Sequence, residues 1–387
     1  MPLVRKIYLG ILGYLISCTG AGGQVPQPGS YNTQAYFAYL TGKRIGVVAN
    51  HTSTIRQVHL VDTLLASGFK VVKIFCPEHG FRGLFDAGEH VSSGTDAKTG
   101  LPIISLYGRH YKPTSSDMKG LDLVIFDLQD VGVRCYTYLS TLHYVMEACA
   151  EHHVPLIVLD RPNPNGFYID GPVLEPRYRS FVGLHPVPLV YGMTIGEYAL
   201  MINGEGWLRK GLRCQLTVIP CSGYQHTMKF ALDVAPSPNL RSMQAIYLYP
   251  SLVLFEGTAI SVGRGTSSPF TCFGHPALDS GNFEFTPKRG TGKLSPLYAD
   301  TLCKGFNLEN YSFNDNQSYF TLQWIGLAYK HFPDKNQFFN RFFPYLAGND
   351  RLKKQIEQGI PEAEIRQSWQ KDLENFKMIR QKYLLYP

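Results

Sequence analysis

Four short apolar runs set the strongest constraint on how this chain can fold. They lie at residues 43–50, 69–76, 121–127 and 154–160. All four are rich in Val and Ile, without the alternation of polar residues that a half-exposed strand shows, so they are typical of strands covered on both faces. The segments between them include apolar residues at helical spacing, at 57–66 and 137–152. The sequence therefore predicts an α/β fold with a Rossmann-like parallel sheet.

Each of these runs ends in a cluster of polar residues. In an open parallel sheet, ligands bind outside the carboxyl ends of the strands, because the loops there are free to carry polar groups. We expect the four clusters to meet at one edge of the sheet, in a cleft of carboxylates, amides and guanidinium groups. The alternative for each residue is that it caps a helix or makes a turn. The candidate ligand contacts in these clusters are His79, Gln129, Asp160, Arg161 and Asn163.

Several function classes are excluded by what the sequence lacks. No G-x-G-x-x-G opens the first helix, and the Gly-Thr-Gly-Lys at 290–293 has no upstream glycine of the kind a P-loop requires, so no nucleotide cofactor is expected. G-x-S-x-G, H-E-x-x-H and C-x-x-C are absent, which disfavours a serine hydrolase, a zincin and a structural zinc site. The 37 Lys and Arg against 30 Asp and Glu are scattered, so nucleic acid is not an expected partner.

Carboxylate chemistry is what remains. Glu78 follows an apolar run directly, and Arg82 and several glycines lie close by in the sequence. A carboxyl in that setting can act as a general acid for a departing alcohol or sugar hydroxyl, and a glycosidase needs two carboxylates. Glu89 and Asp130 are the candidates for the second one. An ion pair between Glu78 and an arginine is the alternative.

Six motifs in chain order resemble the exo-β-N-acetylmuramidase family of the NamZ type. They are PEHGFRG at 77–83, DAGE at 86–89, DLQDVGVR at 127–134, LDRPNP at 159–164, YGMT at 191–194 and SVGRGT at 261–266. The resemblance runs from about residue 42 to the end. It implies a Rossmann-like part without a nucleotide site and a smaller α+β C-terminal part, with the site in the cleft between them. It also implies release of terminal N-acetylmuramic acid from the non-reducing end of peptidoglycan fragments, with Glu78 as the leading catalytic carboxylate and no metal or cofactor.

The implied substrate would give the basic residues a role. N-acetylmuramic acid carries a lactyl carboxylate, and a guanidinium can bind a carboxylate through two parallel hydrogen bonds. The candidate anchors are Arg82, Arg134, Arg161 and Arg264, each with structural ion pairing as its alternative. Tyr136 and Tyr138 could stack on a sugar face, although such tyrosines more often belong to a core.

The N-terminus has the pattern of an export signal. Arg5 and Lys6 precede an apolar run over 7–17 that is too short to span a bilayer comfortably, and the run ends in Cys18 within a sequence that resembles the bacterial lipobox. We expect a signal over 1–18, lipidation of Cys18 and a periplasmic, membrane-tethered protein. Cleavage after Ala21 is the alternative.

The rest of the chain is expected to form a flexible tether and two subdomains. The tether covers 19–30, the Rossmann-like catalytic subdomain 31–190, and the C-terminal subdomain 191–387. Within the last, Thr194 and Glu197 have the spacing of a capping box at a helix start.

The hypothesis from sequence is a secreted or lipid-tethered, exo-acting glycosidase that acts on muramyl saccharides and whose oligomeric state is unknown. Two rivals stay open. One is a non-catalytic peptidoglycan-binding lipoprotein that kept the cleft, and a weaker one is a metal-dependent hydrolase that uses the Asp and His residues at the strand ends.

Overall fold

The computed structural model describes residues 25–82, 93–290, 295–315 and 317–387. Its larger part is a seven-stranded sheet in the order β5-β6-β4-β1-β7-β8-β9, in which only β5 runs antiparallel to its neighbour. The strands are β1 Arg44–Ala49, β4 Lys70–Cys76, β5 Gly94–Thr95, β6 Pro102–Ser105, β7 Leu123–Asp127, β8 Leu156–Leu159 and β9 Leu216–Ile219. The six parallel strands, numbered along the chain, follow the order 3-2-1-4-5-6 of a doubly wound Rossmann fold.

The predicted runs form the centre of this sheet, and helices cover both of its faces. On one face Ile45 and Val47 of β1 pack in a core with Leu60 and Leu64 of α2. On the other face Val48 packs in the main core, to which α4 contributes most of its buried side chains. Because successive side chains of a strand point to opposite faces, the continuous apolar runs are what two-sided burial requires.

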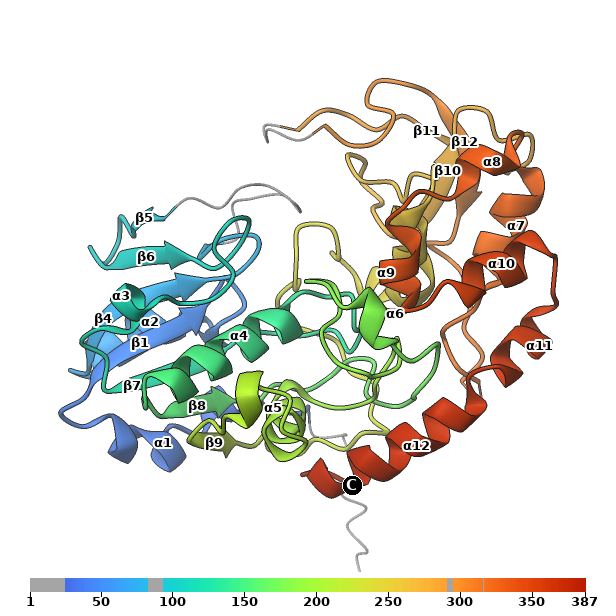
Figure 1. Cartoon of the computed structure of the whole chain (residues 1–387). Helices are drawn as coiled ribbons and strands as arrows, with labels where there is room; N and C mark the ends of the chain where they lie inside the picture. The colour runs from blue at the N-terminus through green and yellow to red at the C-terminus, as the bar shows by residue number, and fades with distance from the viewer. Residues whose placement is uncertain (1–24, 83–92, 291–294, 316) are drawn as a thin grey trace, which may run out of the picture.

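The smaller part is α+β, as predicted. It contains a three-stranded antiparallel sheet in the order β10-β12-β11, which packs with helices from the C-terminal half of the chain. The strands are β10 Cys272–His275, β11 Phe283–Phe285 and β12 Cys303–Asn307. In Figure 1 this sheet lies on the opposite side of the molecule from the large sheet.

The helices and short elements complete the fold. The α-helices are α1 Thr33–Leu40, α2 Leu60–Ala66, α3 Ser115–Met118, α4 Tyr138–Glu151, α5 Ile195–Gly204, α6 Met243–Leu252, α7 Gln323–His331, α8 Lys335–Phe338, α9 Phe343–Ala347, α10 Arg351–Glu357, α11 Glu362–Gln367 and α12 Gln370–Arg380. The 3-10 helices are η1 Gly29–Tyr31, η2 Pro176–Tyr178, η3 Arg209–Gly211, η4 Val253–Gly257 and η5 Gln381–Tyr383. A small hairpin joins β2 Thr54–Ile55 to β3 Val58–His59. No helix of the described residues is long and apolar enough to cross a membrane.

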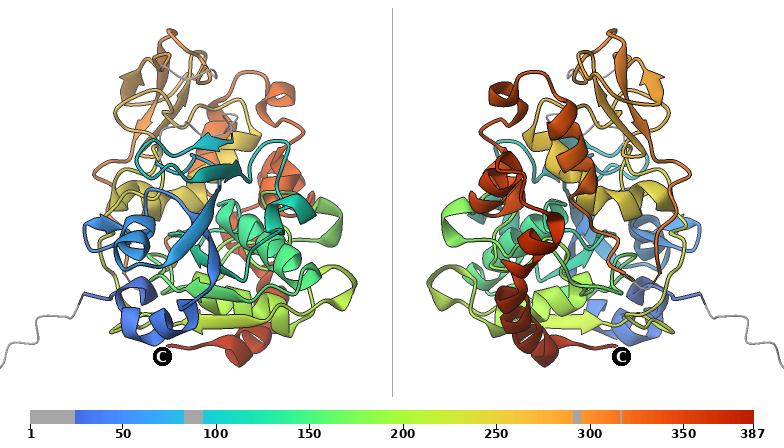
Figure 2. Two further views of the ribbon diagram at one scale, coloured as in Figure 1. Left: turned by 90° about the vertical axis from the view of Figure 1, so that its left-hand side faces the viewer. Right: turned by 90° about the vertical axis from the view of Figure 1, so that its right-hand side faces the viewer.

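The end of the chain returns to the large sheet. Helix α12 leads back to η5, which packs on α5, and Figures 1 and 2 show this return along one edge of the molecule. The predicted capping box is confirmed, since the Thr194 side chain accepts from the Glu197 amide and the Glu197 side chain accepts from the Thr194 amide. The C-terminal helices therefore connect the smaller part to the larger one through the contact of η5 with α5.

Two predicted boundaries differ from the structure. Strand β9 pairs with β8, so the large sheet extends past residue 190, where we expected the Rossmann-like part to end. The predicted tether over 19–30 is docked in its described portion. The amide and carbonyl of Gln27 bond those of Ser222 at 2.9 Å, and the Gly29 amide donates to the Asp160 carbonyl at 2.7 Å. A Pro- and Gly-rich composition does not reveal such pairing with a distant segment.

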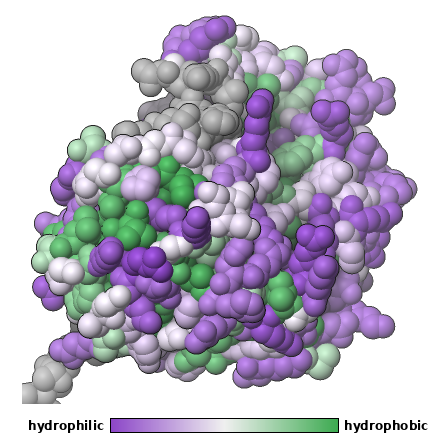
Figure 3. Space-filling view, turned by 60° about the vertical axis from the view of Figure 1, so that its left-hand side comes forward, coloured by the Kyte–Doolittle hydropathy of each residue, from purple (hydrophilic) through white to green (hydrophobic). Residues whose placement is uncertain are grey.

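The surface of the N-terminal part differs in hydropathy from the rest of the molecule on one face. In Figure 3 hydrophobic residues gather on the half of the visible face that the N-terminal part forms, and the rest of that face is mostly hydrophilic. Val72 of β4 and Ile104 of β6 are only partly buried.

Candidate active site

A cavity of about 340 Å³ lies where the two parts of the chain meet. Its volume falls within the range of small-molecule sites, roughly 300–1,000 Å³. The large sheet contributes residues from the loops after β4 and β6 and from the segment before α4. The C-terminal part contributes residues from α6, η4 and the neighbouring loops. The lining residues are Glu78, His79, Tyr107, Cys135, Tyr136, Thr137, Val182, Ser237, Asn239, Leu240, Tyr249, Glu256, Arg264, Phe270 and Phe342.

Glu78 reaches this cavity from the loop after β4, as the sequence predicted. The loop turns sharply, with φ of 72° at His79 and 74° at Gly80, and a left-handed backbone at a non-glycine residue often marks a functional loop. Glu78 is half-buried, and its Oε2 accepts a hydrogen bond from Thr137 Oγ1 at 2.8 Å. The loop after β4 and the start of α4 therefore fix the position of this carboxylate.

Tyr107 lies beside Glu78 and was not identified from sequence. Burial raises the pKa of its hydroxyl above the ordinary value, and the charge of Glu78 and a hydrogen bond to it raise it further. The phenol stays protonated at neutral pH and can donate to the carboxylate. Tyr107 follows β6, and a tyrosine directly after a strand was the only signal available in the sequence.

A second carboxylate enters the cavity from the C-terminal part. Glu256 of η4 pairs with Arg264, whose Nε and Nη2 donate to its Oε1 at 2.8 and 2.5 Å. Arg264 also lies over the ring of Phe270, at 5.0 Å from its centroid. Arg264 is thus placed at the cavity as expected. Sequence reasoning missed Glu256, although a lone charge within the apolar stretch 252–257 was a usable signal.

Tyr136 also lines the cavity. Its hydroxyl donates to the Pro236 carbonyl at 2.7 Å, so the hydroxyl is engaged while the ring forms part of the wall. Tyr138, the other predicted stacking residue, is buried, and its hydroxyl accepts from Asn50 Nδ2 at 2.7 Å. Only the first of the two tyrosines therefore reaches the cavity wall.

The other three arginines are placed elsewhere. Arg82 donates to both carboxylate oxygens of Asp96, at 3.0 and 2.8 Å. Arg161 binds Asp127 in the same way, at 2.6 and 2.9 Å, in a buried pair. Arg134 is almost completely buried and donates to three backbone carbonyls. Among the described lining residues of the cavity, Arg264 is the only arginine.

The predicted polar contacts near β7 and β8 belong mainly to the internal structure. Gln129 donates to the carbonyls of Asp130 and Pro162, at 2.8 Å each. Asp160 is buried and accepts from Thr194 and from the Tyr386 hydroxyl, at 2.7 and 2.6 Å. Asn163 Nδ2 donates to the Met193 carbonyl at 2.8 Å. These residues join segments that are distant in sequence, and they do not line the cavity.

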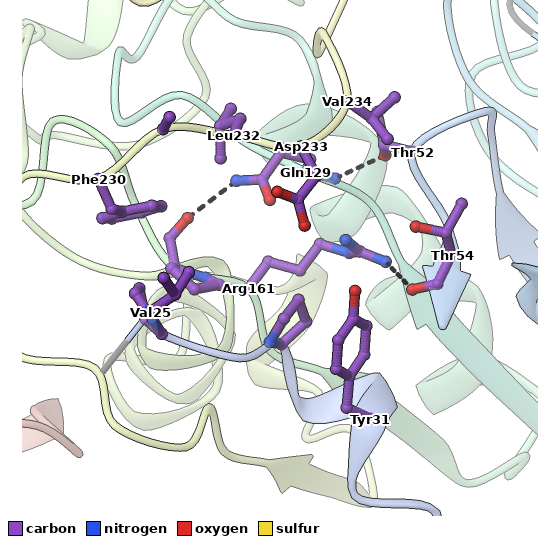
Figure 4. Close-up of a pocket in the computed structure, with 14 residues that line it drawn as sticks. Val25, Tyr31, Thr52, Thr54, Gln129, Arg161, Phe230, Leu232, Asp233 and Val234 are labelled. Carbon is purple, nitrogen blue, oxygen red and sulfur yellow. Dashed lines mark hydrogen bonds between the residues drawn. The ribbon is translucent and has the colours of Figure 1, made fainter. Parts of the chain in front are cut away.

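The crevice at the switch point of the sheet is a separate and much smaller space. It holds about 50 Å³ and includes Thr52, Gln129 and Arg161. Figure 4 shows the docked N-terminal segment, with Val25 and Tyr31, on one side, and Phe230 to Val234 on the other. In a nucleotide-binding Rossmann fold this is the position of the ligand. Here the chain itself fills most of it.

Asp130 is buried away from the cavity. One of its oxygens accepts from the Tyr191 hydroxyl and from the Gly132 amide, and the other has no hydrogen-bond partner among the described residues. Burial raises its pKa from 3.8 to about 7. This position does not suit the predicted role of a second catalytic carboxylate. Glu89 and Cys18 lie outside the described residues.

No group of three or more His, Cys, Asp or Glu that could hold a metal ion occurs among the described residues. The described strand-end residues therefore offer no support for a metal-dependent hydrolase. The fold and this cavity define an α/β protein with two carboxylates, Glu78 and Glu256, in the wall of one site of small-molecule size.

Comparison with known proteins identifies the family. The N-terminal and C-terminal models of exo-beta-N-acetylmuramidase NamZ match residues 45–244 and 247–386, so this chain belongs to that family. The peptidoglycan beta-N-acetylmuramidase NamZ of Bacillus subtilis strain 168 is 39% identical over 371 residues, which cover 91% of this chain and 89% of the relative.

Two solved structures share the fold. Both are DUF1343 family proteins from Bacteroides fragilis NCTC 9343. The first has a TM-score of 0.87 and 46% identity, and the second a TM-score of 0.78 and 28% identity. Each comparison covers 94% of this chain and 99% of the other.

The raised pKa of Asp130 predicts a specific pH dependence of stability. Between pH 3.8 and about 7 the folded state keeps the proton that the unfolded state loses, so the contribution of Asp130 to stability falls as the pH rises. In urea unfolding, the stability of the wild type relative to Asp130→Asn should decline across this interval and level off above it. A difference that stays constant with pH would contradict this placement of Asp130.

Proposed function

We propose that this protein is an exo-acting glycoside hydrolase that releases terminal N-acetylmuramic acid from the non-reducing end of peptidoglycan fragments. Membership of the NamZ family and the muramidase name of the Bacillus subtilis relative support this activity. The observation that carries the proposal is that Glu78 and a second carboxylate, Glu256, line one cavity of a size that suits a sugar. A purely binding protein is not favoured, because the named relative is an enzyme.

In the proposed mechanism Glu78 is the general acid. It gives its proton to the oxygen of the glycosidic bond while the bond from that oxygen to the anomeric carbon breaks. Hydrogen bonds from Thr137 and Tyr107 hold the carboxyl in place. Positioning of this kind contributes directly to the rate, because a small displacement of a catalytic group is costly.

Glu256 is the best-placed described residue for the second carboxylate. It would either deprotonate the water that attacks the anomeric carbon or attack that carbon itself. Arg264 stabilises the negative charge of Glu256 through hydrogen bonds from Nε and Nη2 to Oε1, at 2.8 and 2.5 Å. In the first case the water oxygen bonds to the sugar, and Glu256 takes up one of the water protons. Glu256 then releases this proton to solvent and Glu78 takes one up, which restores both groups. In the second case a water hydrolyses the ester between Glu256 and the sugar, and Glu78 accepts a proton from that water.

Arg264 is the proposed anchor for the lactyl carboxylate. A guanidinium has five N–H donors, and Arg264 uses two of them on Glu256. The other donors make no hydrogen bond to the residues that the structure describes, so they are available for a second carboxylate. The Phe270 ring below the guanidinium restricts its orientation, which favours a fixed fork geometry.

The role of Glu78 predicts a large loss on its replacement. Glu78→Gln should lower kcat for release of N-acetylmuramic acid from a muramyl disaccharide about 100- to 10,000-fold, because the amide cannot supply the proton. The matched control is Glu374→Gln, which changes an exposed carboxylate on α12. Disaccharide turnover by Glu78→Gln at the wild-type rate would refute the proposed mechanism.

The anchor predicts a change of selectivity. The wild type should prefer a muramide with a free lactyl carboxylate over the same compound with that group amidated. Arg264→Lys keeps the charge beside Glu256 but loses the fork, so this preference in kcat/KM should shrink roughly tenfold.

The control for this prediction is Arg82→Lys, which changes an arginine that is bonded to Asp96 outside the cavity. It should leave the preference unchanged. An unchanged preference in Arg264→Lys as well would show that the lactyl group binds elsewhere.

We also propose that the protein is exported and held at the periplasmic face of a membrane through lipid on Cys18. The charged start, the short apolar run and the lipobox-like sequence support this localisation. Cys18→Ala should move the protein from the membrane fraction to the soluble fraction in its native host. A protein that fractionates as before would contradict the lipid anchor.

A further inference from the structure

Four half-buried aromatic residues form a cluster directly beside the cavity. Tyr107 and Tyr111 come from the loop after β6, Tyr144 from α4, and Phe181 from the loop after η2. The Phe181 ring stacks on Tyr111 with centroids 4.1 Å apart at an interplanar angle of 28°. It lies 5.9 Å from Tyr107 and 6.4 Å from Tyr144. We call this cluster the aromatic rim.

The rim is continuous with the cavity at two points. Tyr107 belongs to both, since it lines the cavity and hydrogen-bonds Glu78. Val182, which follows Phe181, also lines the cavity, whereas Tyr111, Tyr144 and Phe181 are not among its lining residues. The aromatic rim therefore begins at Tyr107, next to Glu78, and its other three rings lie outside the cavity.

A tight turn presents Phe181 at this place. The amide of Ser180 donates to the Gly183 carbonyl at 2.9 Å, and the amide of Gly183 donates back at 3.0 Å, so Phe181 and Val182 occupy the tip. A Cβ on Gly183 would lie 3.3 Å from the buried side chain of Arg134, which supports the turn from below. The turn therefore packs against a buried side chain, which fixes the position of Phe181.

We propose that the aromatic rim is the subsite for the leaving saccharide, on the far side of the scissile bond from N-acetylmuramic acid. This inference rests on the proposed function. A cavity of about 340 Å³ suits one terminal sugar, and an exo-acting enzyme must let the remaining saccharide leave that cavity past its general acid. The rim adjoins the cavity at Tyr107, beside that acid, and flat aromatic faces are suited to stacking on the apolar face of a sugar ring.

The assignment predicts that the rim acts only when the leaving group is a sugar. Two substrates separate the effects: the disaccharide of N-acetylmuramic acid and N-acetylglucosamine, and the β-glycosyl fluoride of N-acetylmuramic acid, whose leaving group is one atom. In Phe181→Ala and Tyr111→Ala, the ratio of kcat/KM for disaccharide over fluoride should fall about three- to tenfold. Phe181→Leu keeps apolar bulk without a flat ring. In this variant the ratio should fall nearly as far as in Phe181→Ala.

The control is Tyr39→Ala, which removes an aromatic ring that is 58% exposed on α1, and it should leave the ratio unchanged. A fall in kcat/KM that is equal for both substrates in the rim variants would overturn the assignment, since the rings would then serve the terminal sugar or the fold. A Phe181→Leu variant with the wild-type ratio would overturn the stacking role. If the wild type cleaves neither substrate, the proposed function fails and this inference fails with it.

Discussion

The buried guanidinium of Arg134 is the interaction on which the geometry of the cavity depends. It donates to the carbonyls of Pro172 and Val187 at 2.9 Å and to that of Leu346 at 2.7 Å. These three carbonyls belong to the loop that carries Phe181 and to α9, next to Phe342 of the cavity wall. Because a buried charge without such partners is very costly, the side chain forces these segments together. Arg134 therefore holds the loop that carries Phe181 against α9 of the C-terminal part.

That meeting explains why the site belongs to neither part alone. The large sheet supplies Glu78, in the loop after β4, and its support from Thr137 of the α4 terminus. The C-terminal part supplies Glu256 and Arg264. The switch point, where a Rossmann fold usually binds its ligand, is instead closed by the N-terminal segment and by the Arg161–Asp127 pair. The site therefore lies near the ends of β4 and β6, and not at the centre of the sheet where β1 and β7 end.

The sequence predicts the sheet and Glu78 because both depend on local patterns. Continuous apolar runs mark β1, β4, β7 and β8, and the residues directly after such strands lie at the edge where an open parallel sheet binds its ligands. The role of Arg134 follows from contacts over long sequence separations, such as the one with Leu346, which no local pattern encodes. Glu256 differs, because it is a lone charge in an apolar stretch and its partner Arg264 lies only 8 residues further on. An arginine that satisfies carbonyls looks the same in sequence as one that awaits a substrate. The docking of 25–30, hidden in a Pro-rich segment, was missed for the same reason.

The most direct test is a crystal structure of the Glu78→Gln variant with the disaccharide of N-acetylmuramic acid and N-acetylglucosamine bound. The account predicts that the terminal sugar fills the cavity, with the glycosidic oxygen within hydrogen-bond distance of residue 78. Its lactyl carboxylate should contact Arg264, and its second sugar should lie against Phe181. A disaccharide bound instead in the crevice of Thr52, Gln129 and Arg161, or with residue 78 far from the glycosidic oxygen, would contradict it.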